Sequence, residues 1–384
     1  MGSMQPNNRT HEPLRRKETG RLLFICLLTI TLFGLVDLAY SALRRAHEPG
    51  VRDPVFHHTF RPYFAGPRVW GSSRYMFFTD SLGFADRAPR TVPLKTSAHR
   101  VLFLGDSFTE GMGVPYGQTF VGVFSSALEG RNVEVLNAAV ASYSPRLYYL
   151  KLKYWLDQGL GVDELFVFID ISDIQDEAFF ARNGIVWGEV DPEAVDPRTL
   201  ILGTRFFPAR RWASEHLMLT TIAYRAVGTL LRRRGGHRVG SDDLVETFDL
   251  SPSTPRWLWE RGAWTFDRAL FDAWGRDGLA LCRMYMEKVV ALCEEHKIKL
   301  RVAVYPWPYQ ILAKEVNSPQ VAYWSEFCSS RGIPFLNFFP YFEGESQPET
   351  AVRKFFIRGD IHLNPEGHQK LAAVLTDFWR AMQQ

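Results

Sequence analysis

The stretch VLFLGDSFTEGMGV, residues 101–114, passes from four apolar residues directly into a glycine, an aspartate and a serine. A short apolar run that ends at a turn is typical of a strand buried on both faces of a sheet. Helical periodicity then begins near Phe108 and continues through QTFVGVFSSALEG up to Gly130. Ser107 is therefore predicted to lie where a buried strand passes into a helix.

The same alternation of apolar runs and amphipathic segments continues to the C-terminus. Further strands are predicted at residues 133–140, 164–172, 299–307 and 333–338, and helices at residues 145–160, 278–298, 320–332 and 364–382. Strands and helices in this order predict an α/β fold, with a parallel sheet between two layers of helices. Ligands of such sheets bind at the carboxyl ends of the strands, which is where Ser107 would lie.

A long apolar segment follows basic residues near the N-terminus. Residues 22–43 contain no Lys or Arg and a single acid, Asp37, and four basic residues precede them at 15–17 and 21. This length is near the roughly 20 residues of a membrane-spanning helix. The basic residues predict a cytoplasmic N-terminus, which leaves the rest of the chain in the periplasm. The alternative is a cleaved signal peptide with its cleavage site at residues 39–41, and this alternative also exports the chain.

Composition shifts divide the chain into regions. We expect a disordered cytoplasmic tail at 1–20, a transmembrane anchor at 21–43, an irregularly packed lead-in segment at 44–98 and an α/β domain at 99–384 with a helical insertion at about 180–275. Within the insertion, residues 215–236 are apolar on one side and end in three arginines. This segment either lies on the outer leaflet, or docks on a membrane partner, or packs on the core as an ordinary insertion helix.

Charge and cysteine content exclude several functional classes. The net charge of +3 is too small to indicate nucleic-acid binding. The four cysteines, at positions 26, 282, 293 and 328, include no CxxC pair, so neither a zinc site nor a disulfide framework is predicted. We expect no metal and no organic cofactor.

Three residues at opposite ends of the α/β domain have the types and the predicted placement of a catalytic triad. Asp360 and His362 are two positions apart, so in an extended segment their side chains point to the same side. Asp360 could then hold one imidazole nitrogen while the other accepts the proton of Ser107. The alternatives are that Ser107 only caps its helix, and that Asp360 caps the last helix. His368 lies within that helix and is expected to be structural.

The segments that contain these residues resemble the SGNH, or GDSL, hydrolase superfamily. GDSFTEG is similar to its first sequence block, and DIHLNPEGH is similar to its last block in the Asp-x-His variant of membrane-associated acyltransferases and esterases. The resemblance covers roughly residues 100–180 and 280–384. It implies the SGNH hydrolase fold, a three-layer α/β/α arrangement with a flavodoxin-like parallel sheet. It also implies Ser107 as nucleophile, His362 as base and Asp360 as the acid that orients it.

The two middle blocks of the family are altered in this chain. NAAVASYSP occupies the second block, where Ser142 matches a glycine whose backbone N–H donates to the oxyanion. DISDIQDE occupies the third block, where Ser172 and Asp173 match an Asn-Asp pair. The resemblance therefore implies an oxyanion hole built from Ser107, Ser142 and, less directly, the shorter side chain of Ser172.

Other residues near the predicted cleft are candidates for substrate binding. They are Asp106 and Asp173 in the matched blocks, and Tyr305 and Trp307 in YPWPYQ, whose aromatic rings could stack on a sugar or line the core. TDSLGFADR, residues 79–87, is similar to a segment of exported SGNH proteins that act beside multi-pass membrane O-acyltransferases. That similarity implies an acylated envelope polysaccharide as substrate and such an acyltransferase as partner.

The resulting hypothesis is a membrane-anchored serine esterase or O-acyltransferase that acts on O-acetyl groups of an envelope or exported polysaccharide. One alternative is a non-catalytic SGNH module that binds glycan or scaffolds a membrane acyltransferase, which the altered third block favours. Another alternative is a lysophospholipase, which would prefer long acyl chains over acetyl.

Overall fold

The computed structural model describes residues 12–53, 55–71, 73–182, 216–220, 222–223, 261–315, 317–342 and 347–383. The chain divides into two compact units. The first contains residues 1–48 and 200–238, and the second contains residues 49–199 and 239–384. Most of the predicted insertion at 180–275 lies outside the described residues.

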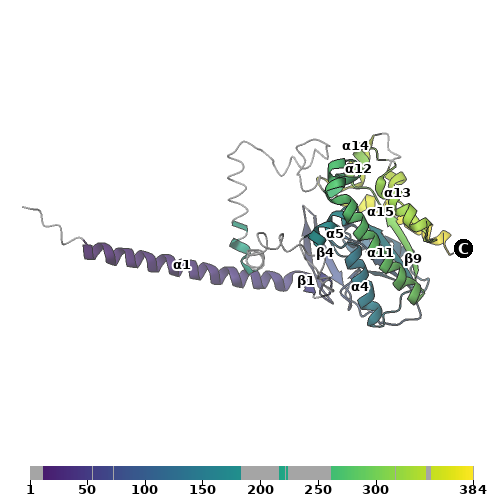
Figure 1. Cartoon of the computed structure of the whole chain (residues 1–384). Coiled ribbons are helices and arrows are strands. Elements are labelled where there is room, and N and C mark those ends of the chain that lie inside the picture. Colours follow the sequence, from purple (N-terminus) through teal and green to yellow (C-terminus); the bar gives the residue numbers. More distant parts are fainter. Residues whose placement is uncertain are drawn as a thin grey trace, which may run out of the picture. The chain divides into compact units, whose positions relative to one another are not determined.

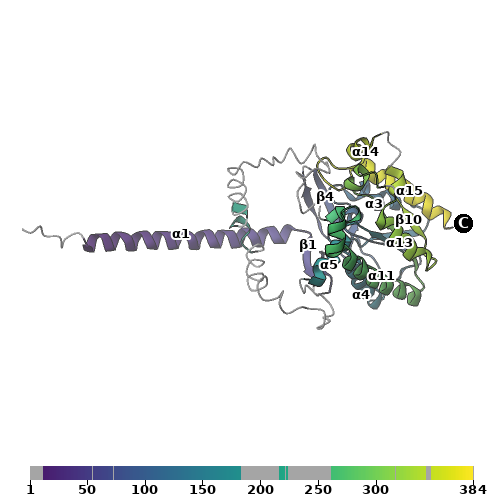
Figure 2. The same ribbon diagram turned by 45° about the horizontal axis from the view of Figure 1, so that its top comes forward.

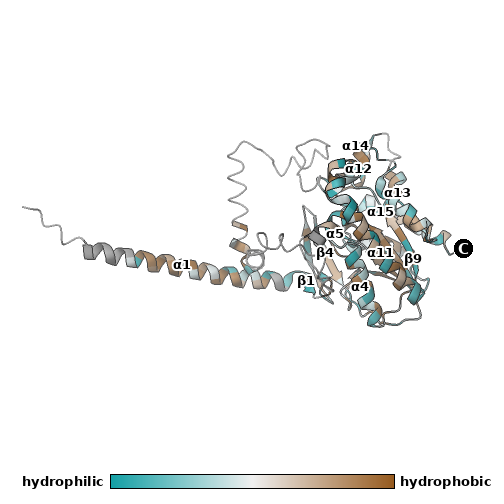
Figure 3. Ribbon diagram, viewed as in Figure 1, coloured by the Kyte–Doolittle hydropathy of each residue, from teal (hydrophilic) through white to brown (hydrophobic). Residues whose placement is uncertain are grey.

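The first unit contains one long helix, α1 (Glu12–His47), which includes the predicted anchor at 21–43. Residues 12–20 also belong to this helix, which corrects the expectation of a disordered tail for that part. Its segment Gly20–Arg44 is long and apolar enough to cross a membrane, and Figure 3 shows apolar residues along this part of the helix. Most of its large apolar side chains are exposed, such as Leu22 and Phe24. The orientation across a membrane and the alternative of a cleaved signal stay predictions.

Asp37, the single acid of the apolar segment, is fully buried and binds part of the insertion. Its carboxylate accepts hydrogen bonds from the backbone N–H of Leu219 at 2.8 Å, and from the N–H and the hydroxyl of Thr220 at 2.9 and 2.6 Å. The described part of the segment 215–236 therefore bonds to α1, which was not among the expected arrangements. The rest of that segment lies outside the described residues.

Five parallel strands form the centre of the second unit. They are β6 (His99–Leu104), β7 (Val133–Asn137), β8 (Glu164–Ile169), β9 (Lys299–Val304) and β10 (Phe335–Asn337). Their order, β10-β9-β8-β6-β7, is the flavodoxin-like order that the family resemblance implies. The chain reverses its direction of winding between β6 and β8, and such a reversal opens a crevice at the carboxyl ends of these two strands.

Helices follow the strands in two groups (Figures 1 and 2). One group pairs α3 (Phe120–Ala127) with α15 (Pro365–Ala381). The other contains α4 (Pro145–Asp157), α5 (Asp173–Arg182), α11 (Arg276–His296) and α13 (Pro319–Ser329). Right-handed crossovers place the two groups on opposite faces of the sheet. Among the described residues of this unit, the remaining α-helices are the short α2 (Ser107–Glu110), α10 (Arg268–Leu270), α12 (Pro308–Leu312) and α14 (Pro348–Phe355).

The apolar runs that predicted the strands form the core of this unit. Every residue of β8 is buried, and the rings of Phe103 and Phe166 on neighbouring strands stack with their centroids 5.2 Å apart. Cys282, Cys293 and Cys328 are buried free thiols, as expected. Trp264, which the sequence placed in the insertion, is also buried here and donates to the carbonyl of Ile171 at 2.9 Å.

The lead-in segment 44–98 is not irregular, which corrects the expectation. β1 (Gly50–Asp53) and β2 (His57–Phe60) form a hairpin, and β3 (Ala65–Trp70), β4 (Ser73–Thr79) and β5 (Ala85–Asp86) extend the main sheet as antiparallel strands beyond β7. The burial of β4 alternates along the strand, as in a sheet with one covered face. Gly71 has a φ of +55°, which the tight β3–β4 turn requires.

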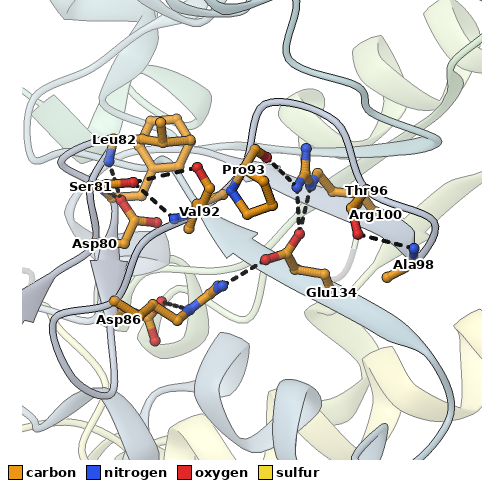
Figure 4. Close-up of polar contacts among 12 residues, drawn as sticks. Asp80, Ser81, Leu82, Asp86, Val92, Pro93, Thr96, Ala98, Arg100 and Glu134 are labelled. Carbon is orange, nitrogen blue, oxygen red and sulfur yellow. Dashed lines mark hydrogen bonds and ion pairs between the residues drawn. The ribbon is translucent and has the colours of Figure 1, made fainter.

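The predicted motif TDSLGFADR forms the turn between β4 and β5 (Figure 4). The carboxylate of Asp80 accepts hydrogen bonds from the backbone N–H of Leu82 and Phe84 at 2.7 and 3.0 Å. Gly83 has a φ of +75°, and a Cβ at this position would lie 2.4 Å from the carbonyl oxygen of Phe60. This motif therefore has a structural role, because it joins the antiparallel strands to the sheet.

Candidate active site

Ser107 is the first residue of α2 and lies directly after β6, at the carboxyl end of the sheet. The side chain of Asp106 caps the helix by accepting from the N–H of Phe108 at 3.0 Å. A Cβ on Gly105 would lie 2.2 Å from Oγ1 of Thr109, so the sharp turn from strand to helix needs glycine there. The cap is thus Asp106, and the Ser107 hydroxyl, which lies 3.2 Å from Oδ2 of Asp106, does not cap the helix.

The structure brings Ser107, His362 and Asp360 into one hydrogen-bonded chain. Nε2 of His362 lies 2.8 Å from Oγ of Ser107, across a sequence separation of 255 residues. Nδ1 of His362 lies 2.5 Å from Oδ1 of Asp360. Because a carboxylate only accepts, Nδ1 holds the ring proton and Nε2 is the acceptor for the serine hydroxyl.

Asp360 is held in its ionised form although it is largely buried. Burial acts to raise the pKa of this carboxyl. Hydrogen bonds from the ring and the backbone N–H of His362 and from Nε1 of Trp70 act to lower it, and together they outweigh burial, so the pKa is below its usual value. Trp70 also meets the imidazole edge-on, with ring centroids 5.3 Å apart. On its other side, the imidazole packs against Phe108 at 5.0 Å.

The triad opens onto a cavity of about 360 Å³. Residues of seven different segments of the second unit form its wall, and several are apolar or aromatic. The lining residues are Trp70, Asp106, Ser107, Met112, Ala141, Ser142, Ser172, Arg261, Trp307, Gly359, Asp360, Ile361 and His362. The predicted nucleophile, base, acid and oxyanion residues therefore all border the same space.

Two backbone N–H groups beside this cavity are available to an oxyanion. In the part of the chain that the structure describes, neither the N–H of Ser107 nor that of Ser142 has an acceptor. Ser142 has a φ of +61°, the left-handed conformation that glycine adopts most readily. The backbone N–H of Ser172, in contrast, donates to Oδ1 of Asp170 at 2.7 Å, so only the hydroxyl of this residue could face a substrate.

Three buried acids cluster at the carboxyl end of the sheet, with carboxylate oxygens of Asp106, Asp170 and Asp173 all within 4.8 Å of one another. Of the three, Asp106 borders the cavity. Burial raises the pKa of Asp106 and of Asp173 well above the ordinary value, and repulsion from the neighbouring acids adds to it. The acids also accept hydrogen bonds from the hydroxyls of Tyr148 and Tyr305 and from Nε1 of Trp307.

The four predicted substrate-binding residues divide into two pairs. Asp106 and Trp307 border the cavity. Tyr305 and Asp173 do not border it and are buried in the network behind, which corrects the prediction for these two. The hydroxyl of Tyr305 donates to Asp106 at 2.9 Å, and Asp173 accepts from the hydroxyl of Tyr148 at 2.8 Å.

His368 is structural, as expected. It is buried in α15, and its Nδ1 accepts from the backbone N–H of Phe120 at 3.2 Å. Burial lowers the pKa of its ring to about 3. A neutral ring at physiological pH is what this acceptor role needs.

Sequence reasoning missed two residues of the site. Trp70 belongs to the lead-in segment, where the alternation of β3 and β4 around a glycine could have indicated a hairpin. Arg261 belongs to the predicted insertion and forms an ion pair of 2.7 Å with Asp176. Burial raises the pKa of Asp176 to about 6, although Arg261 works against this shift. No pattern near Arg261 signals its place in the cavity wall.

No protein-family model matches the chain, and no curated protein matches it. Among solved structures, a lipolytic protein of the G-D-S-L family from Veillonella parvula DSM 2008 is 13% identical with a TM-score of 0.35, over 73% of this chain and 97% of that chain. The psychrotrophic esterase EstA from Pseudoalteromonas sp. is 8% identical with a TM-score of 0.37, over 74% and 98%. The acetyl xylan esterase AlAXEase is 11% identical with a TM-score of 0.38, over 73% and 98%. Because these values are low, the chemistry of the site has to be derived from its own geometry.

Proposed function

We propose that this chain is an SGNH-type serine enzyme that cleaves or transfers an ester-linked acyl group. The observation that supports this most is the 2.8 Å contact between Oγ of Ser107 and Nε2 of His362, beside an open cavity. A serine that only caps its helix, or a histidine that only packs in the core, would not need this contact. Asp360 completes the arrangement, because it fixes the tautomer and orientation of the imidazole.

The residues divide the reaction into two steps. Oγ of Ser107 attacks the ester carbonyl carbon, and its proton passes to Nε2 of His362. The carbonyl oxygen becomes an oxyanion that the N–H groups of Ser107 and Ser142 stabilise. When the tetrahedral intermediate collapses, the C–O bond breaks and His362 returns the proton to the leaving alcohol. Water or a second alcohol then attacks the acyl-serine with His362 as base again, which gives hydrolysis or transfer.

The altered third block lowers the expected rate. A serine at position 172 reaches less far than the asparagine that the resemblance implies, and the loss of one oxyanion donor costs about 10²–10³ in rate. The hydroxyl of Ser172 borders the cavity, so it could still donate through a water molecule. A slow enzyme is therefore expected.

We propose an O-acetyl group on an envelope or exported polysaccharide as the substrate. The cavity wall combines the aromatic rings of Trp70 and Trp307 with Met112 and Ile361, which suits a small acyl group and the apolar face of a sugar. The apolar length of α1 supports a site at the membrane, outside the cytoplasm. A multi-pass membrane O-acyltransferase remains the proposed partner.

The test uses the full chain in detergent with p-nitrophenyl acetate, followed by intact-mass analysis. We expect a mass increase of one acetyl group on Ser107, and turnover that Ser107→Ala abolishes. Ser329→Ala is the matched control, because this exposed serine only bonds to the carbonyl of Glu326 within its own helix. Release of acetate that does not depend on Ser107 would contradict the proposal and favour the non-catalytic module, and a preference for palmitoyl esters would favour the lysophospholipase.

A further inference from the structure

The backbone between β7 and α4 turns sharply beside Ser107. The N–H of Tyr143 donates to the carbonyl of Val140 at 3.1 Å, which closes a four-residue turn with Ala141 and Ser142 at its centre. The N–H of Val140 donates to the carbonyl of Gly105 at 3.3 Å, so the turn is attached to the segment that precedes the nucleophile. The positive φ of Ser142, +61°, at the third position is typical of a type II turn.

The central peptide of this turn has a side-chain partner from a distant part of the chain. Nε2 of His58, on β2, lies 2.6 Å from the carbonyl oxygen of Ala141. That carbonyl and the N–H of Ser142 belong to the same peptide unit, which is trans. In a trans peptide the two groups point in opposite directions. A bond that holds the carbonyl towards His58 therefore directs the Ser142 N–H to the opposite side.

The turn needs such a bond because the residue at position 142 is a serine. Rotation of the central peptide converts a type II turn into a type I turn, and the N–H then points the other way. A non-glycine residue in the left-handed conformation costs about 1–2 kcal/mol. Serine thus favours the type I alternative, whereas a glycine would adopt the type II conformation without this cost.

His58 is itself held in place from two sides. Nδ1 of His57 lies 2.8 Å from Nδ1 of His58, and the hydroxyl of Tyr143 donates to the backbone carbonyl of His58 at 2.6 Å. Because the carbonyl of Ala141 only accepts, Nε2 of His58 holds the proton. In the neutral ring Nδ1 is then the acceptor, and His57 is the donor. Burial lowers the pKa of His58, although its bond to Ala141 works in the opposite direction, and this net shift favours the neutral ring.

We propose that His58 is a positioning residue for ester cleavage: it holds the 141–142 peptide so that the Ser142 N–H faces the oxyanion. This inference rests on the proposed function and deepens it, because it assigns the lead-in hairpin a role in the chemistry. It also explains how the chain tolerates a serine at the position where the family resemblance implies a glycine. His58 does not touch the substrate and acts through the backbone of Ala141.

The test is a double-mutant cycle on the full chain in detergent. We expect His58→Ala to lower kcat for p-nitrophenyl acetate by about 10²-fold with little change in KM, as for the loss of one oxyanion donor. His58→Gln keeps a donor near the position of Nε2 and should recover most of this loss. Adding Ser142→Gly to His58→Ala should also recover at least about tenfold, because glycine adopts the left-handed conformation unaided. His99→Ala is the matched control, since His99 bonds to Glu164 at 2.9 Å at the other end of β6.

A second measurement separates failure of this inference from failure of the proposed function. In a type II turn, the Ala141 Hα and the Ser142 N–H give a strong nuclear Overhauser effect, and a type I turn weakens it. We expect this signal to weaken in His58→Ala and to return with Ser142→Gly, whether or not the chain is an enzyme. An unchanged signal in His58→Ala, or a loss of kcat that Ser142→Gly does not recover, would overturn the role of His58.

Discussion

Buried charged side chains have different neighbours at the two ends of the central sheet. At the amino ends of the strands, Arg100 on β6 is fully buried and forms an ion pair of 2.6 Å with Glu134 on β7. Its remaining donors bond to the backbone carbonyl of Pro93 at 2.8 Å (Figure 4) and to those of Leu94 and Gly161 at 3.0 Å. Glu164 on β8 is also buried, 2.7 Å from Arg301 on β9. Each charge there faces an opposite charge.

At the carboxyl ends, acids face acids. Among the described residues, no ion pair joins Asp106, Asp170 or Asp173 to a basic side chain. Burial and repulsion between these acids raise the pKa of Asp106 and of Asp173 instead. The comparison teaches that the amino end is arranged for stability, whereas the carboxyl end holds groups that a stable core would exclude. Such a concentration of perturbed acids is common beside catalytic sites.

The largest expected effect concerns activity at the carboxyl end. His362→Ala should lower kcat/KM by about 10²–10⁴-fold, because the general base is lost. Ester cleavage by the full chain measures this effect. The unfolding midpoint should change little, and His296→Ala, an exposed histidine at the end of α11, should behave like the wild type. Full activity of His362→Ala would remove the contrast between the two ends.

The next effect concerns stability at the amino end. Arg100→Met should lower the free energy of unfolding by about 1–3 kcal/mol, because it removes one of the two arginine partners of Glu134, the other being Arg90, and the donor to the carbonyl of Pro93. Urea denaturation followed by tryptophan fluorescence measures the change. The double variant Arg100→Met/Glu134→Gln should recover part of the loss. A stability within about 0.5 kcal/mol of the wild type for Arg100→Met would contradict the assigned role.

A smaller effect concerns how the stability of the fold depends on pH, because the acids at the two ends of the sheet should change it in opposite directions. Burial raises the folded-state pKa of Asp173, so its contribution to stability is present near the unfolded value of 3.8 and is lost as the pH rises. Burial also acts to raise the pKa of Glu134, but Arg90 and Arg100 lower it overall, so its contribution is present above the unfolded value of 4.5 and is lost as the pH falls. Asp173→Asn should therefore reduce the loss of stability that accompanies a rise in pH above 3.8, and Glu134→Gln the loss that accompanies a fall in pH below 4.5. Unfolding midpoints measured from pH 3 to 9 test both expectations. If both variants changed the slope of unfolding midpoint against pH in the same way, the proposed difference between the two ends of the sheet would be wrong.

The smallest effect is expected away from both ends. Arg87 and Glu129 form a surface ion pair at 2.7 Å, with side chains 52% and 63% exposed. Solvent screens such a pair, so Arg87→Ala should change the free energy of unfolding by at most about 1 kcal/mol and leave ester cleavage unchanged. Urea denaturation in low and high salt tests this expectation. A larger loss would mean that the antiparallel edge of the sheet depends on this contact.

Local patterns in the sequence were sufficient for much of the fold. The apolar runs predicted all five parallel strands, because side-chain burial in a two-sided sheet depends on the strand's own residues. The order of the strands was implied by the family resemblance alone. The Gly-Asp-Ser turn after β6 and the Asp-x-His spacing near the C-terminus likewise predicted which side chains would point into one cleft. The antiparallel strands β3, β4 and β5 were missed, because short strands among prolines and arginines resemble loops.

The sequence by itself determined the residue types of the site and the ends of the strands on which they lie. Only the tertiary structure decided that Trp70 meets His362, that Tyr305 and Asp173 are buried behind the cavity, and that His58 contacts the carbonyl of Ala141. These contacts join residues 83 or more positions apart. Periodicity describes the environment of one element at a time, whereas such contacts depend on how elements pack against one another. That packing sets which donors and charges meet, and therefore the chemistry of the site.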